Sequence, residues 1–421
     1  MFHLFKRELI PGLSSFFTIA YLLLLYPQIL SEGGVDFGSA LTATILTLFL
    51  STLLLALYGN FPFVLAPGLS VVVYLVYSLL MKQQAPWPTA LGIVFWAGVT
   101  LFLLSVFKVR QKILFHLPPS IRSAAIGGIG LFLIFVAFKG LGAIVQDPTY
   151  FFRVGNFFTL QNGVALFGLI LLLFLYRLQV GASFLIAILS CWGISLALNL
   201  SSWQGFIGSP APLTSFFQID FLAPFQFKWI GGLITVLLIS LFDTTAAITV
   251  LSKLSGKLDA SGRIQGIDRM VLPDGIGSLI GAVLGTGTVA FLLECSTGIK
   301  AGGKTGWTAM IAATLSLVCI FLYPLISSIP FFAVAPALIA VGLLMAQELK
   351  EVFWKDFTEA IPALFVAITI PLTFSVYLGF ASGFISYVFL KTVSGRAKEV
   401  HPVSWGLSLL FALHSLFTRL I

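Results

Sequence analysis

The stretch GGLITVLLISLFDTTAAITV (231–250) contains one ionisable residue, Asp243, within a run that is otherwise apolar or weakly polar. Its apolar residues are continuous rather than alternating, and the run is long enough to cross the hydrocarbon core of a bilayer as a helix. LTATILTLFLSTLLLAL (41–57) shows the same pattern without any charge. Backbone groups in lipid must pair internally, and continuous apolar runs favour helices over a barrel. The sequence therefore predicts an all-α polytopic membrane protein.

The composition of the whole chain indicates the same class. Hydrophobic residues make up 59% of the 421 residues and charged residues 9%, whereas a soluble domain carries about 25% charged residues. A water-soluble fold of this composition would have too little polar surface to cover itself. We expect no cleavable signal peptide, because the first apolar run ends in Tyr26-Pro27 without a small-residue cleavage site.

Hydropathy along the chain predicts fourteen membrane-spanning segments, with boundaries good to about three residues. A further apolar stretch, Pro402 to Leu420, fits either an additional span or an interfacial helix. The predicted spans lie near 11–31, 38–58, 62–81, 88–107, 121–143, 162–176, 180–199, 229–252, 271–284, 286–299, 305–323, 330–347, 360–377 and 379–394.

The formal net charge of +8 is explained by topology. With the N-terminus in the cytoplasm, nearly all lysines and arginines fall on predicted cytoplasmic segments, as the positive-inside rule requires. We therefore expect a protein of the cell (cytoplasmic or inner) membrane that has the lipid bilayer, and not nucleic acid, as its partner. The exceptions are Lys82, Lys139, Arg153 and Lys228 on the outer side and Arg419 in the tail.

The cysteines and histidines do not form a metal-binding or catalytic pattern. Cys191, Cys295 and Cys319 all fall inside apolar segments without CxxC spacing, and we interpret them as small buried hydrophobic residues. The four histidines are scattered, and no segment carries HExxH, GxSxG or paired histidines. We expect no metal, no other cofactor and no disulfide framework, and the chain lacks the groups that an enzyme active site needs.

Two pairs of segments suggest an internal repeat. LPPSIRSAAIGGIGLFL (117–133) aligns with IPFFAVAPALIAVGLLM (329–345), and this alignment pairs Gly130 with Gly342 within stripes of small residues. The alignment contains four identities, which pair Pro118 with Pro330, Ala125 with Ala337, Gly130 with Gly342 and Leu131 with Leu343.

The second pair consists of GNFPFVLAPGLS (59–70) and GTGTVAFLLECS (285–296), which are both apolar runs interrupted by Gly or Pro. Because seven spans precede the second copy, the two copies would have opposite orientations, as in many secondary transporters. The interrupted third and tenth segments would then meet near the midplane. Their unpaired backbone groups would have to be satisfied by protein, a polar cavity or a substrate.

Two acidic residues, Asp243 and Glu294, lie inside apolar sequence, where an ionised carboxylate costs about 2.5–3.5 kcal/mol on insertion scales. One interpretation is a neutral or paired carboxylate that serves packing alone. The interpretation that we favour is a ligand and proton site at the repeat interface, because a carboxylate can accept two parallel N–H bonds from the edge of a planar heterocycle. Burial disfavours the ionised form, so at least one of these groups would hold the symported proton. Asp274, at the cytoplasmic mouth of the ninth segment, fits either a helix N-cap or a functional group, and Glu359 opens the thirteenth segment; we interpret both as structural.

At these positions the chain resembles the AzgA-like guanine, hypoxanthine and adenine permeases of the nucleobase–cation symporter (xanthine/uracil permease) superfamily. The resemblance extends over nearly the whole chain and is densest from about 230 to 396. It is carried by ELIPGLSSFFTIAY (8–21), LAPG (65–68), 117–133, FDTT (242–245), DGIGSLIGAVLGTGTV (274–289), ECSTGIKAGGKTGWT (294–308), APALIAVGLLM (335–345), DFTEAIPALF (356–365), IPLTFS (370–375) and GFISYVFLKTVSGR (383–396).

The resemblance implies an inverted repeat of seven plus seven spans. Residues 1–107 and 229–328 would form a core domain, and residues 108–228 and 329–421, with the tail helix, a gate domain. The implied function is import of a purine nucleobase (hypoxanthine, guanine or adenine) by proton symport. An elevator-type movement of the core past the gate would carry the base, and homodimers would form through the gate. The implied substrate-binding residues are Asp243, Glu294, Leu293, Cys295, Leu69, Ser70, Val72 and Thr18, of which Asp243 and Glu294 are also the proton-coupling residues.

The chain departs from the family pattern near this implied site. Val72 replaces an asparagine of the APGMGLNAYF string, and Leu25-Tyr26-Pro27 replaces the usual VNP. ECSTG follows where the family often has ESAAG. A lost amide is a lost donor and acceptor, and purine discrimination depends on such pairs. The preferred base is therefore left open.

Three other functions stay open. One is a channel, although occluded acids on interrupted helices favour alternating access over a continuous pore. A transporter of the same architecture could carry uracil, xanthine, ascorbate or a small organic anion, although an anion site favours basic groups or helix N-termini over two acids. A membrane-embedded enzyme is disfavoured by the absence of a nucleophile–base pair or clustered metal ligands.

Overall fold

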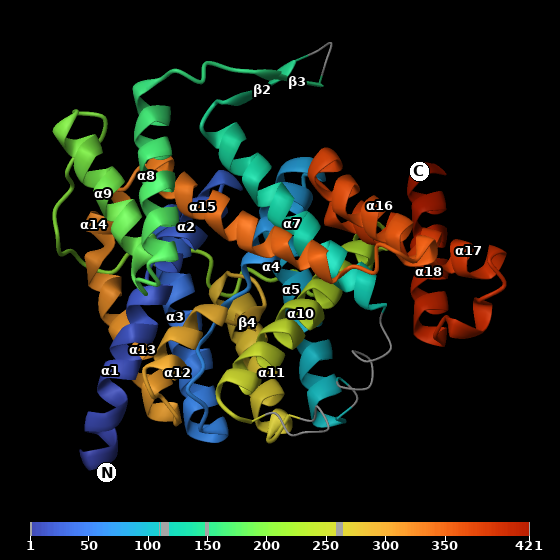
Figure 1. Ribbon diagram of the computed structural model, residues 1–421, viewed down its shortest axis with the longest axis horizontal. Coiled ribbons are helices and arrows are strands. Elements are labelled where there is room, and N and C mark those ends of the chain that lie inside the picture. The colour runs from blue at the N-terminus through green and yellow to red at the C-terminus, as the bar shows by residue number, and fades with distance from the viewer. Residues whose placement is uncertain (1, 109, 111–117, 148–150, 258–263, 421) are drawn as a thin grey trace.

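The computed structural model of the protein describes residues 2–108, 110, 118–147, 151–257 and 264–420. His116, and Leu117 at the start of the first predicted repeat segment, lie outside these residues. Within the described part, nine helical stretches are long and apolar enough to cross a membrane, and the predicted helical membrane protein is confirmed (Figure 1). The nine are Arg7–Glu32, Phe37–Gly59, Trp87–Val106, Pro119–Gly140, Leu160–Arg177, Phe227–Leu254, Gly306–Ser327, Phe331–Glu351 and Val376–Val393.

The other five predicted segments are not among these nine, so the count of fourteen spans stays a prediction. Four of them correspond to shorter or broken elements and the fifth to α11 (Ile267–Leu284), which is 18 residues long but contains three charged residues. The stretch from Pro402 to Leu420 is a helix, α18. The first half contains α1 (Phe2–Ile19), α2 (Leu22–Glu32), α3 (Phe37–Leu54), β1 (Leu65–Pro67), α4 (Leu69–Val73), α5 (Trp87–Val106), α7 (Pro119–Gly140), β2 (Ile144–Asp147), β3 (Phe151–Val154), α8 (Leu160–Arg177) and α9 (Ser183–Ala197). The second half contains α10 (Phe227–Leu254), α11 (Ile267–Leu284), β4 (Val289–Phe291), α12 (Ser296–Lys300), α13 (Gly306–Val318), α14 (Tyr323–Ser327), α15 (Phe331–Ala346), α16 (Phe357–Thr373), α17 (Val376–Val393) and α18 (Pro402–Leu420). Short π-helical turns, η1 (Leu55–Gly59) and η2 (Tyr74–Lys82), extend α3 and α4. The 3₁₀ turns are η3 (Ala223–Phe225), η4 (Leu293–Cys295), η5 (Cys319–Leu322), η6 (Gln347–Glu351) and η7 (Ala397–Glu399).

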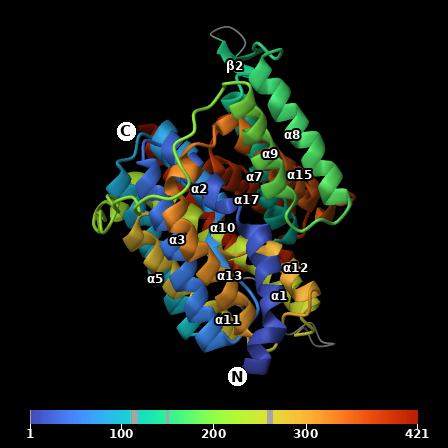
Figure 2. The same ribbon diagram turned by 90° about the vertical axis from the view of Figure 1, so that its left-hand side faces the viewer.

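The helices pack into two groups, each of which combines elements from both halves of the chain. In the first group, α1 packs on α12 and α13, and α11 packs on α3 and α5, with α10 beside α5. In the second group, α7 packs on α15 and α16, α8 and α9 pack on α15, and α18 packs on α17. Figure 2 shows α7, α8, α9 and α15 gathered above α3, α5, α11 and α13. Contacts between the groups include those of α9 with α1 and of α10 with α7, α17 and α18.

The two glycines paired in the sequence alignment lie against each other where α7 crosses α15. A Cβ atom on Gly130 would lie 2.5 Å from the carbonyl oxygen of Gly342, and one on Gly342 would lie 2.6 Å from that of Gly130. Real Cβ atoms do not approach backbone so closely, and neither position has room for a side chain. This crossing therefore depends on small residues in the way that close helix packing in membranes does.

The two interrupted segments meet as a short antiparallel ladder. Leu65 pairs with Phe291 and Pro67 with Val289, which joins β1 to β4. The ladder is extended by the N–H of Gly68, which donates to the Thr288 carbonyl at 2.7 Å. Side chains satisfy backbone groups beside it, because the Thr52 hydroxyl both accepts from the N–H of Leu65 at 3.0 Å and donates to its carbonyl at 2.9 Å. These backbone polar groups at the breaks are thus paired within the protein, as the lipid environment demands.

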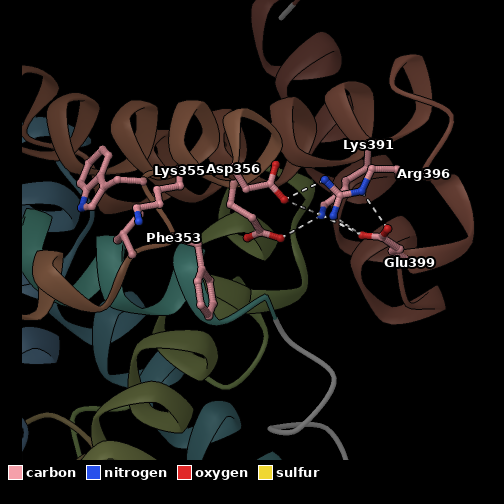
Figure 3. A pocket seen from close by; sticks show the side chains of 9 residues that line it. Phe353, Lys355, Asp356, Lys391, Arg396 and Glu399 are labelled. Atoms are coloured by element: carbon pink, nitrogen blue, oxygen red, sulfur yellow. Dashed lines mark hydrogen bonds and ion pairs between the residues drawn. The ribbon is translucent and has the colours of Figure 1, made fainter.

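Five charged residues at one edge of the second group form a cluster that we call the Asp356 network: Asp356, Glu359, Lys391, Arg396 and Glu399. The Arg396 guanidinium donates to Asp356 at 2.7 Å and, through two N–H groups, to Glu399 at 2.7 and 2.8 Å. The buried Lys391 ammonium lies 3.1 Å from Glu359 and 3.0 Å from Glu399. These side chains line a pocket of about 570 Å³ (Figure 3).

The network fixes the start of α16 against the end of α17. Asp356 is the N-cap of α16, where its carboxylate accepts from the Thr358 N–H at 3.0 Å. Glu359 lies in the first turn of α16, and its ion pair with Lys391 agrees with the structural role predicted for it.

Charge in the Asp356 network should stabilise the protein equally from pH 5 to 8. Hydrogen bonds from Thr358 and Arg396 lower the pKa of Asp356 to about 2, and bonds from Arg396 and Lys391 lower that of Glu399 to about 2. A depressed folded-state pKa contributes stability above the unfolded value of about 4, and this contribution is lost as pH falls towards 2. Asp356→Asn keeps an N-capping group and removes the charge. We expect its melting temperature in detergent to lie below that of the wild type by a constant margin over this range. A margin that changes between pH 5 and 8 would contradict the assignment.

Candidate functional site

Asp243 lies in the second half of the long helix α10, and its side chain is half-buried. Ser70, in the first turn of α4, lies within interaction range of it, and α10 packs on α4. Because α4 directly follows β1, the carboxylate lies beside the interrupted third segment. The helix α10 also packs on β4 and η4 of the tenth segment.

Glu294 lies in the 3₁₀ turn η4, between β4 and α12, and its side chain is half-buried. The hydroxyl of Tyr21 donates to its Oε1 atom at 2.7 Å. The backbone carbonyl of Glu294 accepts from the Thr297 hydroxyl at 3.0 Å, which fixes the turn that carries it. Glu294 is therefore held at the end of the β1–β4 ladder by one side-chain donor and one backbone contact.

Both carboxylates lie near the buried side chain of Tyr26. The ring of Tyr26 is 1% exposed, and its hydroxyl is within electrostatic reach of both Glu294 and Asp243. Two half-buried acids thus stand beside the broken segments of a membrane protein, where polar groups usually mark a substrate or ion pathway. The arrangement can accept N–H donors from a small planar molecule and can exchange a proton.

The other residues implied by the sequence surround this region in different ways. Val72 is fully buried and Leu69 half-buried in α4. Cys295 is fully buried, and its Sγ atom accepts from the Val64 N–H at 3.2 Å. The Thr18 hydroxyl lies 2.8 Å from that of Thr297, and the side chain of Leu293 is 46% exposed. All three cysteines are buried, as predicted.

Three aromatic residues of the site were not singled out in the sequence: Tyr21, Tyr26 and Phe184. The rings of Tyr21 and Phe184 stack, with centroids 4.5 Å apart and an interplanar angle of 22°. The available signals were weak. Tyr21 ends the family-like stretch 8–21, and Tyr26 stands at a departure from the family pattern.

The prediction that Asp274 is a helix N-cap is wrong. The helix α11 begins at Ile267 with Gly266 as its N-cap, so Asp274 lies two turns inside it. Asp274 is fully buried and forms an ion pair with Arg110 at 2.5 Å. Hydropathy placed the start of this helix too late in the chain, because the first turn of α11 contains charged residues.

Comparison with known proteins places this geometry in a family. Residues 6–382 match a family described as the Permease family. The chain belongs to this family. It is 30% identical over 413 residues to the adenine permease AdeP of Escherichia coli (strain K12), a match that covers 98% of this chain and 93% of the relative. It is 32% identical over 438 residues to the guanine/hypoxanthine permease PbuG of Bacillus subtilis (strain 168), covering 99% of this chain and 97% of the relative.

The fold is also known from a solved structure. The transmembrane domain of a cyanobacterial bicarbonate transporter, BicA, superposes with a TM-score of 0.67 at 17% identity, covering 91% of this chain and 97% of that domain. At this identity the likeness concerns the fold alone. The family resemblance drawn from the sequence is confirmed, and the protein is a multi-pass permease, not an enzyme.

Proposed function

We propose that this permease is a secondary active transporter that imports a purine nucleobase (hypoxanthine, guanine or adenine) by proton symport. The observation that carries the proposal is the pair of half-buried acids, Asp243 and Glu294, beside the β1–β4 ladder. The adenine and guanine/hypoxanthine permeases among its relatives support a purine as the cargo.

Recognition follows from the chemistry of the two carboxylates. Each can accept N–H groups from the edge of a base, and such charge-assisted bonds are stronger than those between neutral groups. The aromatic rings of Tyr21, Tyr26 and Phe184 provide flat apolar surface nearby. A planar heterocycle with adjacent N–H donors satisfies both kinds of group.

Proton coupling follows from the free-energy cost of keeping ionised carboxylates inside the membrane. Two ionised acids around one site would repel each other and lose hydration, so the empty site favours a form that holds a proton. Asp243 or Glu294 would take up this proton on the side of higher proton concentration and release it inside. Transport would then be driven by the proton gradient with H⁺ as the coupling ion.

The movement that we propose is an elevator-type motion between a core and a gate. The core would be residues 1–107 and 229–328, and the gate 108–228 and 329–421, in a 7+7 inverted repeat with fourteen spans. The crossing of α7 and α15 at Gly130 and Gly342 and the β1–β4 ladder support the repeat. The packing of the helices into two groups supports the division. The N-terminus would lie in the cytoplasm of a cell whose cytoplasmic membrane holds the protein, and the gate helices would form any homodimer.

Uptake in a bacterium that lacks its own nucleobase transporters tests the proposal. We expect accumulation of radiolabelled hypoxanthine, guanine or adenine that unlabelled purines compete away and that a protonophore abolishes. Uracil, xanthine, ascorbate and small organic anions belong in the same competition series, because they are the cargoes of the alternative function. Preferred uptake of one of these, or purine uptake that the protonophore leaves intact, would overturn the corresponding part of the proposal.

A further inference from the structure

Tyr21 connects the Glu294 carboxylate to the second group of helices. It lies at the break between α1 and α2, and its side chain is fully buried. Its hydroxyl donates to Glu294 Oε1 at 2.7 Å, and its ring stacks on Phe184 of α9. Phe184 also makes an edge-on contact with Tyr176 of α8, and the two ring centroids lie 6.5 Å apart.

A second contact between the two helix groups lies close to Glu294. Gly181 lies just before α9, and a Cβ atom there would lie 3.5 Å from Thr18 Cγ2 and 3.9 Å from Thr297 Cγ2. The hydroxyls of Thr18 and Thr297 lie 2.8 Å apart, and Thr297 also holds the backbone of Glu294. The start of α9 therefore packs against the segment that carries Glu294.

The hydrogen bond from Tyr21 leaves Glu294 available to a ligand. A carboxylate has about four acceptor positions on its two oxygens, and Tyr21 uses one of them. Glu294 as a whole residue is half-buried. The titratable groups that face Glu294 in the described part of the chain are Tyr21, Tyr26 and Cys295, with Asp243 reached through Tyr26.

We propose that Tyr21 is a positioning residue for Glu294 and that its stack on Phe184 is the contact by which the two helix groups close over a bound base. This inference rests on the proposed function. Tyr21 sets the direction in which Glu294 presents its free acceptor positions. Phe184 covers Tyr21 when α9 meets α1 and separates from it when the groups move apart.

Tyr21→Phe keeps the ring and its stack but removes the donor to Glu294. We expect the KM for the purine to rise about tenfold, as loss of a hydrogen bond to a charged group predicts. We also expect uptake to persist to higher pH, because Glu294 without this donor keeps its proton more readily. An unchanged KM together with an unchanged pH limit would overturn the role of Tyr21. A purely structural role would not move the pH limit.

Phe184→Leu is the matched change on the other side of the stack, because it keeps an apolar side chain and leaves the Tyr21–Glu294 bond intact. We expect a lower maximal rate with an unchanged pH limit, and recovery of the rate in Phe184→Tyr, which restores an aromatic ring. Membrane insertion of each variant is followed with a fluorescent protein fused to the C-terminus. A wild-type maximal rate in Phe184→Leu would overturn the closing role of the stack.

A disulfide assay tests closure without any transport. Thr18→Cys with Gly181→Cys brings two thiols close together, because a Cβ atom at position 181 would lie 3.5 Å from Thr18 Cγ2, a position that the Sγ atom of a cysteine at 18 can occupy. We expect rapid cross-linking with a mild oxidant, no cross-link in either single variant, and several-fold slower cross-linking when Phe184→Leu is added. An equal rate with and without Phe184 would overturn the proposal. If the cross-link behaves as expected but no purine is carried, the proposed cargo fails while the closing contact stands.

Discussion

Replacing Glu294 with alanine is expected to reduce the efficiency of purine uptake by about two orders of magnitude. The carboxylate lies beside the β1–β4 ladder with acceptor positions left for a ligand, and two charge-assisted hydrogen bonds to a base contribute about 3 kcal/mol. Their loss predicts a decrease in kcat/KM of about 100-fold. Initial rates of uptake with a saturation series in purine, normalised to the amount of inserted protein, measure this effect.

The conservative changes separate binding from coupling. Glu294→Gln and Asp243→Asn keep the shape and one carbonyl acceptor but cannot exchange a proton, so accumulation against a gradient should lose its pH dependence in at least one of them. Glu8→Gln is the matched control. Glu8 is also buried, at 4% exposure, but it serves the start of α13 by accepting from the Lys304 N–H at 3.2 Å. Full pH-dependent accumulation in both Glu294→Gln and Asp243→Asn would disprove the assignment of proton coupling to these acids.

The class of fold and the two acids could be predicted from local sequence, because both depend on hydropathy over short windows. Continuous apolar runs specify membrane helices wherever they occur, and a carboxylate inside such a run stands out by its cost. The interruptions at 59–70 and 285–296 were visible as Gly and Pro within apolar sequence. Their register, with Leu65 opposite Phe291, could not be predicted, because it depends on the packing of helices far apart in the chain.

The site features that could not be predicted from the sequence have a common cause. Tyr21 and Phe184 look like ordinary packing residues in an apolar run, and only the tertiary structure shows that their rings stack beside an acid. The ion pair that gives Asp274 its structural role was not predicted, because its partner, Arg110, lies far away in the sequence. A residue whose role is set by a partner across the fold leaves little local signal.

Breaking the ion pair between Arg110 and Asp274 is expected to lower the stability of the protein strongly. Both side chains are at most 1% exposed, and the Arg110 Nη1 atom lies 2.5 Å from Asp274 Oδ2. Thr244, next to Asp243 in α10, places its hydroxyl 3.3 Å from the same carboxylate. The pair therefore braces the part of α10 that carries the candidate acid.

Arg110→Met leaves Asp274 as an uncompensated buried charge, and breaking a buried pair in this way costs about 3–5 kcal/mol. We expect a strongly lowered melting temperature of the purified protein, measured by fluorescence-detected size exclusion after heating. Adding Asp274→Asn removes the orphaned charge and should recover most of the loss. The matched control is Lys108→Met, which removes an exposed ion pair to Asp268 at 3.2 Å and should cost about 1 kcal/mol or less. If Arg110→Met melts no lower than Lys108→Met, the buried pair does not brace α10, and the position of Asp243 must be fixed by Ser70 and the packing of α10 alone.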